Sequence, residues 1–289
     1  MLVNTKYLTI LSGNPRGGEA TWNSLYKNVL EPLNSDLAIC TGNKWIINQS
    51  FLKVAKFKWI FEEPSNWEQY YESNFDGKWK EYFFKGIDTG LYSSGMIHFA
   101  LKDIILKNYI EDILNYDVII FSRFDQFYLT EQKKFDTNYI HIPSGEDYFG
   151  ICDRHAIVPK KYIIDFLKIC EFVNSDQALD YNDNHLNCEV TFKNQLDSFG
   201  LLNKVKRFNR TQFTSALNSD FTNWRVPKYK LYFFNKLMIK YPDEFIQSFK
   251  NINIFKKINL ILNKNIFLYF NYLYIQLRIY LGKLKQTYR

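Results

Sequence analysis

The stretch that decides the fold spans residues 116–128 and reads YDVIIFSRFDQFY. Its four consecutive apolar residues, Val118 to Phe121, favour a strand covered on both faces, as in the sheet of an α/β protein. Arg123 and Asp125 follow this strand directly. In open α/β sheets ligands bind at the carboxyl ends of the strands, so these two charged side chains are candidates for a binding site. A turn that carries a surface salt bridge is the alternative.

The residues before and after this stretch alternate between strand-like and helix-like patterns. Strands are predicted over residues 6–11, 36–40, 57–61, 139–142 and 201–208. Helices are predicted over residues 20–30, 95–114, 160–173 and 189–199. The alternation predicts an α/β fold in which helices flank a mostly parallel, Rossmann-like sheet.

A glycine-rich turn, SGNPRGG at residues 12–18, separates the first predicted strand from the first predicted helix. Strand, glycine turn and helix together can present backbone N–H groups to a phosphate. The turn matches neither the Walker loop nor the GxGxxG pattern, so an ordinary tight turn is the alternative.

Composition narrows the classes of protein that need to be considered. The chain has 289 residues, of which 46% are hydrophobic and 18% aromatic, enough for a substantial core. That excludes a largely disordered chain. The first residues lack the pattern of a signal peptide, and no run of apolar residues is long enough for an ordinary transmembrane helix. We therefore expect a cytoplasmic protein with free thiols at Cys40, Cys152, Cys170 and Cys188.

Positive charge is concentrated at the C-terminus. The net charge is +7, and residues 250–289 hold eight basic residues and no acidic one. We expect residues 1–215 to form the catalytic domain and residues 216–289 a basic, aromatic and helical region. Basic side chains beside long apolar ones are typical of an amphipathic helix that binds an anionic membrane surface. Because a nucleic acid cannot use those apolar side chains, it is the less favoured partner. A helical pair packed on the globular domain is the alternative.

Taken together, these segments resemble GT-A type glycosyltransferases, particularly bacterial enzymes of surface polysaccharide synthesis (lipopolysaccharide or capsule). Residues 116–125 are similar to the strand and turn that hold a divalent metal and the diphosphate of the sugar nucleotide. Residues 10–40 look like the first nucleotide-binding β-α-β unit of that group. Residues 146–150, EDYFG, are similar to its acceptor-side loop, and the helix start at residues 187–189 resembles one that supplies an acidic side chain. The resemblance covers roughly residues 5–210.

The resemblance implies a role for each of these positions. Gly13, Arg16, Gly17, Arg123 and Asp125 would contact the nucleotide sugar, and Asp125 would also bind Mn²⁺ or Mg²⁺. Asp147 or Glu189 would be the base near the acceptor hydroxyl. One departure concerns the metal, because the DxD motif of the family has two acids and the first position here is Arg123. That arginine could replace part of the cation's charge on the diphosphate.

The implied partners are a nucleotide-sugar donor and a glycan or lipid-linked acceptor. The implied location is peripheral, on the cytoplasmic face of the inner membrane. Two alternatives remain open. Residues 15–22 are faintly similar to the phosphosulfate loop of sulfotransferases, although they lack its Ser/Thr-rich, Lys-bearing form. The basic and aromatic tail could also belong to a non-enzymatic protein that binds nucleic acid.

Overall fold

The computed structural model describes residues 5–46, 49–83, 95–181, 187–217, 219–220, 232–233, 237–260 and 266–287. The chain forms two compact units, each built from segments that are distant in sequence. Unit 1 comprises residues 1–14, 34–123 and 134–208. Unit 2 comprises residues 15–33, 124–133 and 209–289. Its last segment begins close to the boundary that we expected after residue 215, but its first two segments come from the N-terminal half of the chain.

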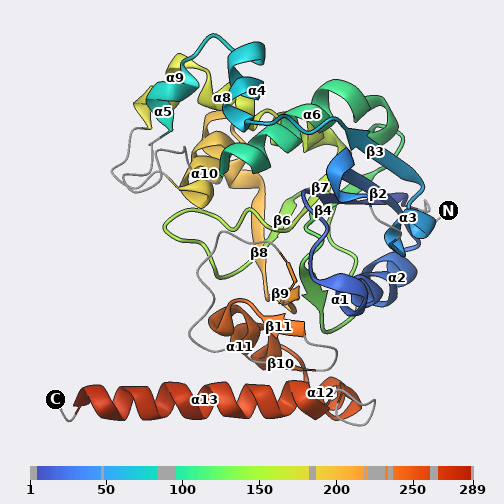
Figure 1. Ribbon diagram of the computed structural model, residues 1–289, viewed down its shortest axis with the longest axis vertical. Helices are drawn as coiled ribbons and strands as arrows, with labels where there is room; N and C mark the ends of the chain where they lie inside the picture. The colour runs from blue at the N-terminus through green and yellow to red at the C-terminus, as the bar shows by residue number, and fades with distance from the viewer. Residues whose placement is uncertain are drawn as a thin grey trace. The chain divides into compact units, whose positions relative to one another are not determined.

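Unit 1 is built on a seven-stranded mixed sheet with the strand order β3-β2-β1-β4-β7-β6-β8 (Figure 1). The strands are β1 (Tyr7–Ser12), β2 (Ser35–Gly42), β3 (Phe57–Phe61), β4 (Val118–Ser122), β6 (Ile140–Pro143), β7 (Ala156–Pro159) and β8 (Val205–Phe208). Only β7 runs antiparallel to its neighbours in this sheet. The predicted α/β fold with a mostly parallel sheet is confirmed, and β7 is a strand that the sequence patterns did not indicate.

The helices of unit 1 flank this sheet. They are α3 (Phe51–Val54), α4 (Trp67–Asn74), α5 (Trp79–Tyr82), α6 (Gly95–Ile113), α7 (Ile163–Leu167), α8 (Ile169–Val173), α9 (Asp176–Asp180) and α10 (Cys188–Ser198). Figure 1 shows α6, α8 and α10 grouped on one side of the strands. Helix α6 packs against β1, α7 and α8, and its apolar side chains join those of β1 and β4 in one core.

The central position of β4 follows from its sequence. All five of its residues are buried, and it pairs with β1 in a register that sets Ile10 beside Phe121. From β1 the chain builds β2 and β3 on one side and later adds β4 on the other, so the strand order reverses between β1 and β4. In doubly wound sheets ligands bind beside such a switch point, at the carboxyl ends of the strands. Residues that follow β4 and β6, and residues that precede the antiparallel β7, all lie at that edge.

Unit 2 contains an antiparallel sheet with the strand order β10-β11-β9-β5. Its strands are β5 (Gln126–Tyr128), β9 (Gln212–Leu217), β10 (Tyr232–Phe233) and β11 (Leu237–Ile239). Its helices are α1 (Gly18–Leu25), α2 (Glu31–Leu33), α11 (Pro242–Lys250), α12 (Ile254–Leu260) and α13 (Ile266–Thr287), and a π-helical turn spans Tyr26–Leu30. Apolar side chains from β5, β9, β11, α11 and α13 form its core. We did not predict these four short strands.

Two further expectations can be compared with the structure. The four cysteines are free thiols, as predicted, and three of them are buried. Within the described residues, no helix combines the length and the apolar character that crossing a membrane would need.

Candidate functional site

Charged side chains gather at the carboxyl edge of the unit 1 sheet. They come from five places in the chain: the end of β4, helix α6, the loop after β6, the residues before β7, and the first turn of α10. The residues are His98, Lys102, Arg123, Glu146, Asp147, Asp153, Arg154 and Glu189. These residues are distant in sequence, for example His98 of α6 and Glu189 of α10, so they come close only in the folded unit.

Arg154 lies between two carboxylates. Its Nη1 is 3.5 Å from Glu146 Oε2, and its Nη2 is 3.5 Å from Glu189 Oε1. The Tyr148 hydroxyl donates a hydrogen bond to the same Glu146 oxygen over 2.6 Å, and the Arg154 guanidinium lies 5.7 Å from the Tyr148 ring centroid. The Arg154 side chain is 8% exposed. A buried guanidinium needs such partners, because an unpaired buried charge is strongly destabilising.

Glu189 is a buried carboxyl group of this cluster whose pKa is strongly raised. Helix α10 begins with Asn187 as its N-cap, whose side chain accepts a hydrogen bond from the Val190 N–H over 2.8 Å. This cap places Glu189 in the first helical turn, where it is 9% exposed. Burial and then the negative charge of Asp153 raise the pKa of Glu189 to about 7, although Arg154 opposes the shift. A carboxyl group with such a pKa can accept and release a proton near neutral pH.

Asp147, the other predicted base, is engaged differently. Its Oδ1 accepts hydrogen bonds from Arg207 Nη2 over 2.6 Å and from the Cys152 backbone N–H over 2.9 Å. These contacts connect the loop after β6 to β8. The loop also reaches α10, because the Ile151 N–H donates to the Glu189 carbonyl over 3.0 Å. The structure therefore brings both predicted acids to one loop and helix, with Asp147 tethering the loop and Glu189 inside the charged cluster.

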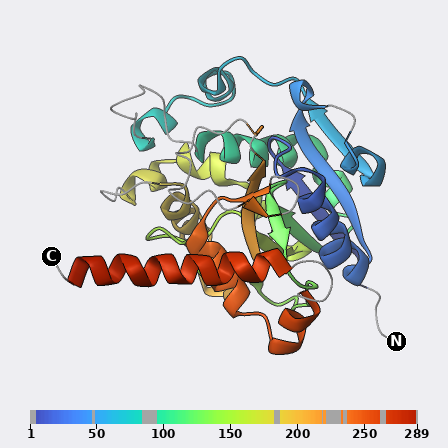
Figure 2. The same ribbon diagram turned by 60° about the horizontal axis from the view of Figure 1, so that its bottom comes forward.

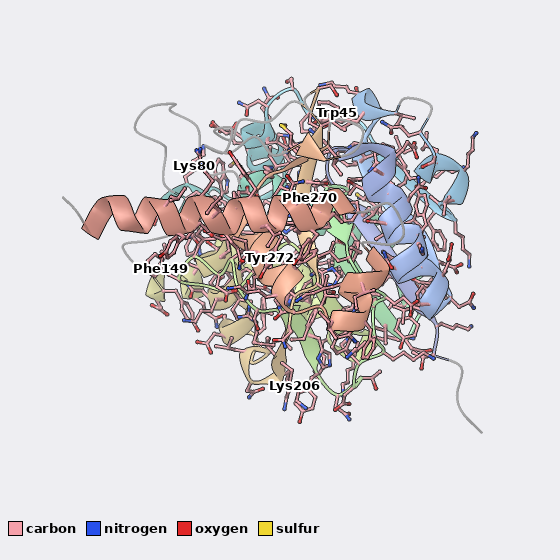
Figure 3. All side chains as sticks on the ribbon, turned by 90° about the horizontal axis from the view of Figure 1, so that it is seen from below. Trp45, Lys80, Phe149, Lys206, Phe270 and Tyr272 are labelled. Carbon is pink, nitrogen blue, oxygen red and sulfur yellow. The ribbon has the colours of Figure 1, made fainter. Side chains whose placement is uncertain are left out.

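The loop after β6 also carries backbone strain. Glu146, Tyr148 and Phe149 have positive φ angles of 56°, 42° and 71°. Non-glycine residues rarely adopt this conformation, and such strain tends to cluster at functional sites. A Cβ on Gly150 would overlap the backbone carbonyl of Glu189, so only glycine fits this approach. Phe149 is 85% exposed at the tip of the loop (labelled in Figure 3).

Asp153, which acts electrostatically on Glu189, has titratable neighbours of its own. His98 Nε2 is 3.8 Å from Asp153 Oδ2. Burial lowers the pKa of His98 to about 4, so the imidazole is neutral at pH 7. Burial alone would raise the pKa of Asp153, but His98, Arg154, Arg123 and Lys102 together lower it below its ordinary value. Asp153 is therefore ionised at neutral pH.

Lys102 is the cation of this group that is most enclosed by aromatic rings. Its Nζ lies 4.5 Å from the ring centroid of Phe166 and 4.2 Å from that of Phe192. Burial lowers the pKa of Lys102 to about 8.

Four residues of this cluster, His98, Lys102, Asp153 and Arg154, were not predicted as site residues from the sequence. For two of them a sequence signal existed, because the four-residue spacing of His98 and Lys102 places both side chains on one face of a predicted helix.

Arg123 and Asp125 belong to different units. Arg123 follows β4 in unit 1, and its charge contributes to lowering the pKa values of His98 and Asp153. Asp125 precedes β5 in unit 2, where its carboxylate is 2% exposed and lies 3.9 Å from Lys240 Nζ. The Asp125 backbone carbonyl accepts a hydrogen bond from the Ser215 N–H over 2.8 Å. Within unit 1, Arg123 is thus part of the charged cluster.

The predicted phosphate turn is also divided between the units. Gly13, in unit 1, has a φ of 101°, and its N–H donates to the Cys40 carbonyl over 3.0 Å. Arg16 and Gly17 belong to unit 2, where the Arg16 carbonyl accepts from Trp22 Nε1 over 3.0 Å. The Gly17 N–H donates to Asp220 Oδ2 over 2.9 Å. In this structure the N–H that we assigned to a phosphate contacts a carboxylate of the same chain.

Among the described residues, no group of three or more His, Cys, Asp and Glu side chains is arranged to hold a metal. Mg²⁺ and Mn²⁺ need several oxygen ligands, whereas the carboxylate of Asp125 faces the ammonium of Lys240. The predicted Mn²⁺ or Mg²⁺ therefore remains a prediction from the resemblance.

Comparisons with known proteins do not assign this chain to a family. No protein-family model matches the sequence, and no curated protein matches it either. The charged cluster in unit 1 is consequently the main support for a function.

Proposed function

We propose that this protein is a glycosyltransferase that moves a sugar from a nucleotide-sugar donor to a hydroxyl of a glycan or lipid-linked acceptor. The observation that carries the proposal is Glu189, a buried carboxyl group with a pKa near 7 at the carboxyl edge of the sheet. Arg123 and Arg154 supply positive charge to the same cluster. Glycosyl transfer with inversion needs both features, a base for the acceptor and cations for the leaving diphosphate.

In the proposed reaction, Glu189 acts in its carboxylate form. The acceptor oxygen forms a bond to the anomeric carbon while the bond from that carbon to the diphosphate oxygen breaks. The proton of the acceptor hydroxyl passes to Glu189, and Arg154 limits the pKa shift that burial imposes on this carboxyl group. Arg123 would stabilise the negative charge that develops on the leaving diphosphate, because its planar guanidinium can donate two hydrogen bonds to phosphate oxygens.

The mostly parallel sheet supports the finer proposal of a GT-A-like fold. Its strand order reverses between β1 and β4, and nucleotides bind beside such a reversal in doubly wound folds. Because one fold can host many functions, this support is weaker than that of the charged cluster. A role in bacterial surface polysaccharide synthesis, on the cytoplasmic face of the inner membrane, completes the proposal and rests on the resemblance of short segments.

A thermal-shift panel tests the donor site. The full chain is heated with UDP, GDP, CMP, CDP or phosphoadenosine phosphate, each with and without Mn²⁺. A ligand that binds the folded state raises the melting temperature. We expect a shift with one pyrimidine or guanine nucleotide, and we expect Arg123→Ala to remove it. Lys53→Ala, which removes an exposed cation of α3 outside the charged cluster, should leave the shift unchanged.

The panel can also overturn the proposal. A shift with phosphoadenosine phosphate alone would favour the sulfotransferase. A chain that is folded but shifts with no nucleotide would contradict a nucleotide-sugar donor. A shift that requires Mn²⁺ would show that a metal completes the site in spite of the single carboxylate at Asp125.

A further inference from the structure

The outer face of α13 exposes a stripe of large apolar side chains. These side chains recur every three or four residues, which places them on one face of the helix. Their exposed fractions range from 42% to 61%. The residues are Phe270, Leu273, Tyr274, Leu277, Tyr280 and Leu281. Figures 2 and 3 show α13 as one continuous red helix, with Phe270 labelled on it in Figure 3.

The opposite face of α13 is already covered within unit 2. Leu268 and Ile275 are 0% and 1% exposed in the apolar core. Tyr272 stacks on Phe249 of α11, with 4.7 Å between the ring centroids. Helix α13 is therefore fixed by its inner face, while its outer face leaves large apolar side chains exposed. Such a face is normally covered by a partner.

Helix α12 also exposes large apolar side chains. Ile254, Phe255 and Ile258 are 63%, 79% and 47% exposed. Among the described residues, nine of the fifteen exposed large hydrophobic side chains belong to residues 254–281. Such a concentration marks an interaction site, whereas single exposed apolar residues need no explanation.

The charge of this region identifies the kind of partner. Residues 250–289 contain eight basic residues and no acidic one, so an anionic surface is favoured. The partner must also accept Phe, Leu and Ile side chains along a helix about 33 Å long. A nucleic acid offers the charge without the apolar interior, whereas an anionic bilayer offers both. Tyrosines at the margin of the stripe suit the interface, because one end of each is apolar and the other polar.

We propose that α12 and the outer face of α13 bind the surface of an anionic lipid bilayer, with α13 lying in the plane of the interface. The apolar stripe enters the boundary between head groups and acyl chains, and the basic side chains contact the head groups. This surface belongs to unit 2 and does not depend on the proposed chemistry at Glu189.

Vesicle flotation tests the proposal. The full chain is mixed with vesicles of phosphatidylcholine alone or of phosphatidylcholine with phosphatidylglycerol, at low and at high salt. We expect flotation with the anionic vesicles, reduced by salt because screening weakens the attraction of the basic residues. The double variant Phe270→Glu, Leu277→Glu is expected to lower the partition coefficient by about tenfold or more, since it places two acids in the stripe that would enter the bilayer.

Ile164→Glu with Ile97→Glu is the matched control. Both isoleucines are 42% exposed in unit 1, so this variant adds the same charge outside the stripe, and its flotation is expected to match the unchanged chain. Circular dichroism confirms that both variants are folded. An equal loss in the control would show that net charge, not this face, controls binding. Absence of flotation in the folded, unchanged chain at low salt would overturn the proposal. If instead the unchanged chain self-associates and the stripe variant does not, the face binds a second copy of the chain, which would also overturn it.

Discussion

At the residue scale, Glu189 is the side chain on which the proposed chemistry depends. We expect Glu189→Gln to lower the rate of sugar transfer by about 10²–10⁴-fold, because the amide cannot accept the acceptor proton. Nucleotide binding should persist, because Glu189 is not assigned to the diphosphate. In the unchanged protein, kcat/KM should rise with pH through about 7, since only the carboxylate is a base. Initial rates across a pH series measure both effects.

Asp147→Asn is the comparison for that experiment. Asp147 accepts hydrogen bonds from Arg207 and the Cys152 N–H, so its loss should loosen the loop and raise KM more than it lowers kcat. If Asp147→Asn removed activity while Glu189→Gln kept it, the roles of the two acids would be reversed.

The same carboxyl group should make stability depend on pH. The pKa of Glu189 is about 7 in the folded protein, against 4.5 for an ordinary glutamate. Between these values the folded state binds more protons than the unfolded state, so the free energy of unfolding falls as pH rises. Urea titrations at several pH values should show this decline, and Glu189→Gln should flatten it. An unchanged slope in the variant would mean that the carboxyl titrates normally.

Gly150 should be intolerant of any side chain. A Cβ there would overlap the Glu189 carbonyl, so Gly150→Ala must push the loop away from α10. Gly200→Ala is the comparison, because Gly200 has a φ of 65° but nothing lies within 4 Å of its added Cβ. We expect a cost of about 1–2 kcal/mol from backbone strain at Gly200 and a larger one at Gly150. Equal losses in chemical denaturation would rule out the close approach.

At the element scale, the two faces of α13 should respond differently to truncation. Ile275 is 1% exposed and belongs to the apolar core of unit 2, so Ile275→Ala should cost about 2–4 kcal/mol of unfolding free energy. Leu277 is 55% exposed, and Leu277→Ala should change stability by no more than about 0.5 kcal/mol. Denaturant melts of the two variants measure the difference. Comparable losses would mean that the outer face is also covered by protein.

At the scale of the whole molecule, the interleaving of the two units makes the C-terminal region indispensable. A chain that ends at residue 208 lacks β9. In the full chain β9 pairs with β5, and its Ser215 hydroxyl hydrogen-bonds to the Thr21 hydroxyl of α1 over 2.8 Å. We expect this truncated chain to aggregate, because α1 and β5 lose their partners. A chain that ends at residue 253 keeps the antiparallel sheet of unit 2 and α11. It should be more soluble than the chain of residues 1–208. Size-exclusion chromatography compares them. A monomeric, folded chain of residues 1–208 would contradict this view of unit 2.

Local patterns determined much of unit 1 in advance. The runs of apolar residues at β1, β2, β3 and β4 and the long apolar face of α6 fixed their positions to within a few residues, because buried parallel strands and long helices carry strong signals. Strands β5, β9 and β11 gave no such signal, since they are short and gain stability only by pairing with distant segments. The same patterns marked Arg123 as a candidate, whereas Asp147 and Glu189 became candidates through the resemblance to a known family.

Tertiary structure decided what each candidate contacts. The rise in the pKa of Glu189 to about 7 requires burial and the negative charge of Asp153, which comes from another segment of the chain. Arg123 and Asp125, two positions apart, belong to different units because the chain passes from β4 to β5 between them. The sequence by itself determined most elements of the unit 1 sheet and the residue types that follow its strands. Only the fold determined their surroundings, because desolvation and charge act through space.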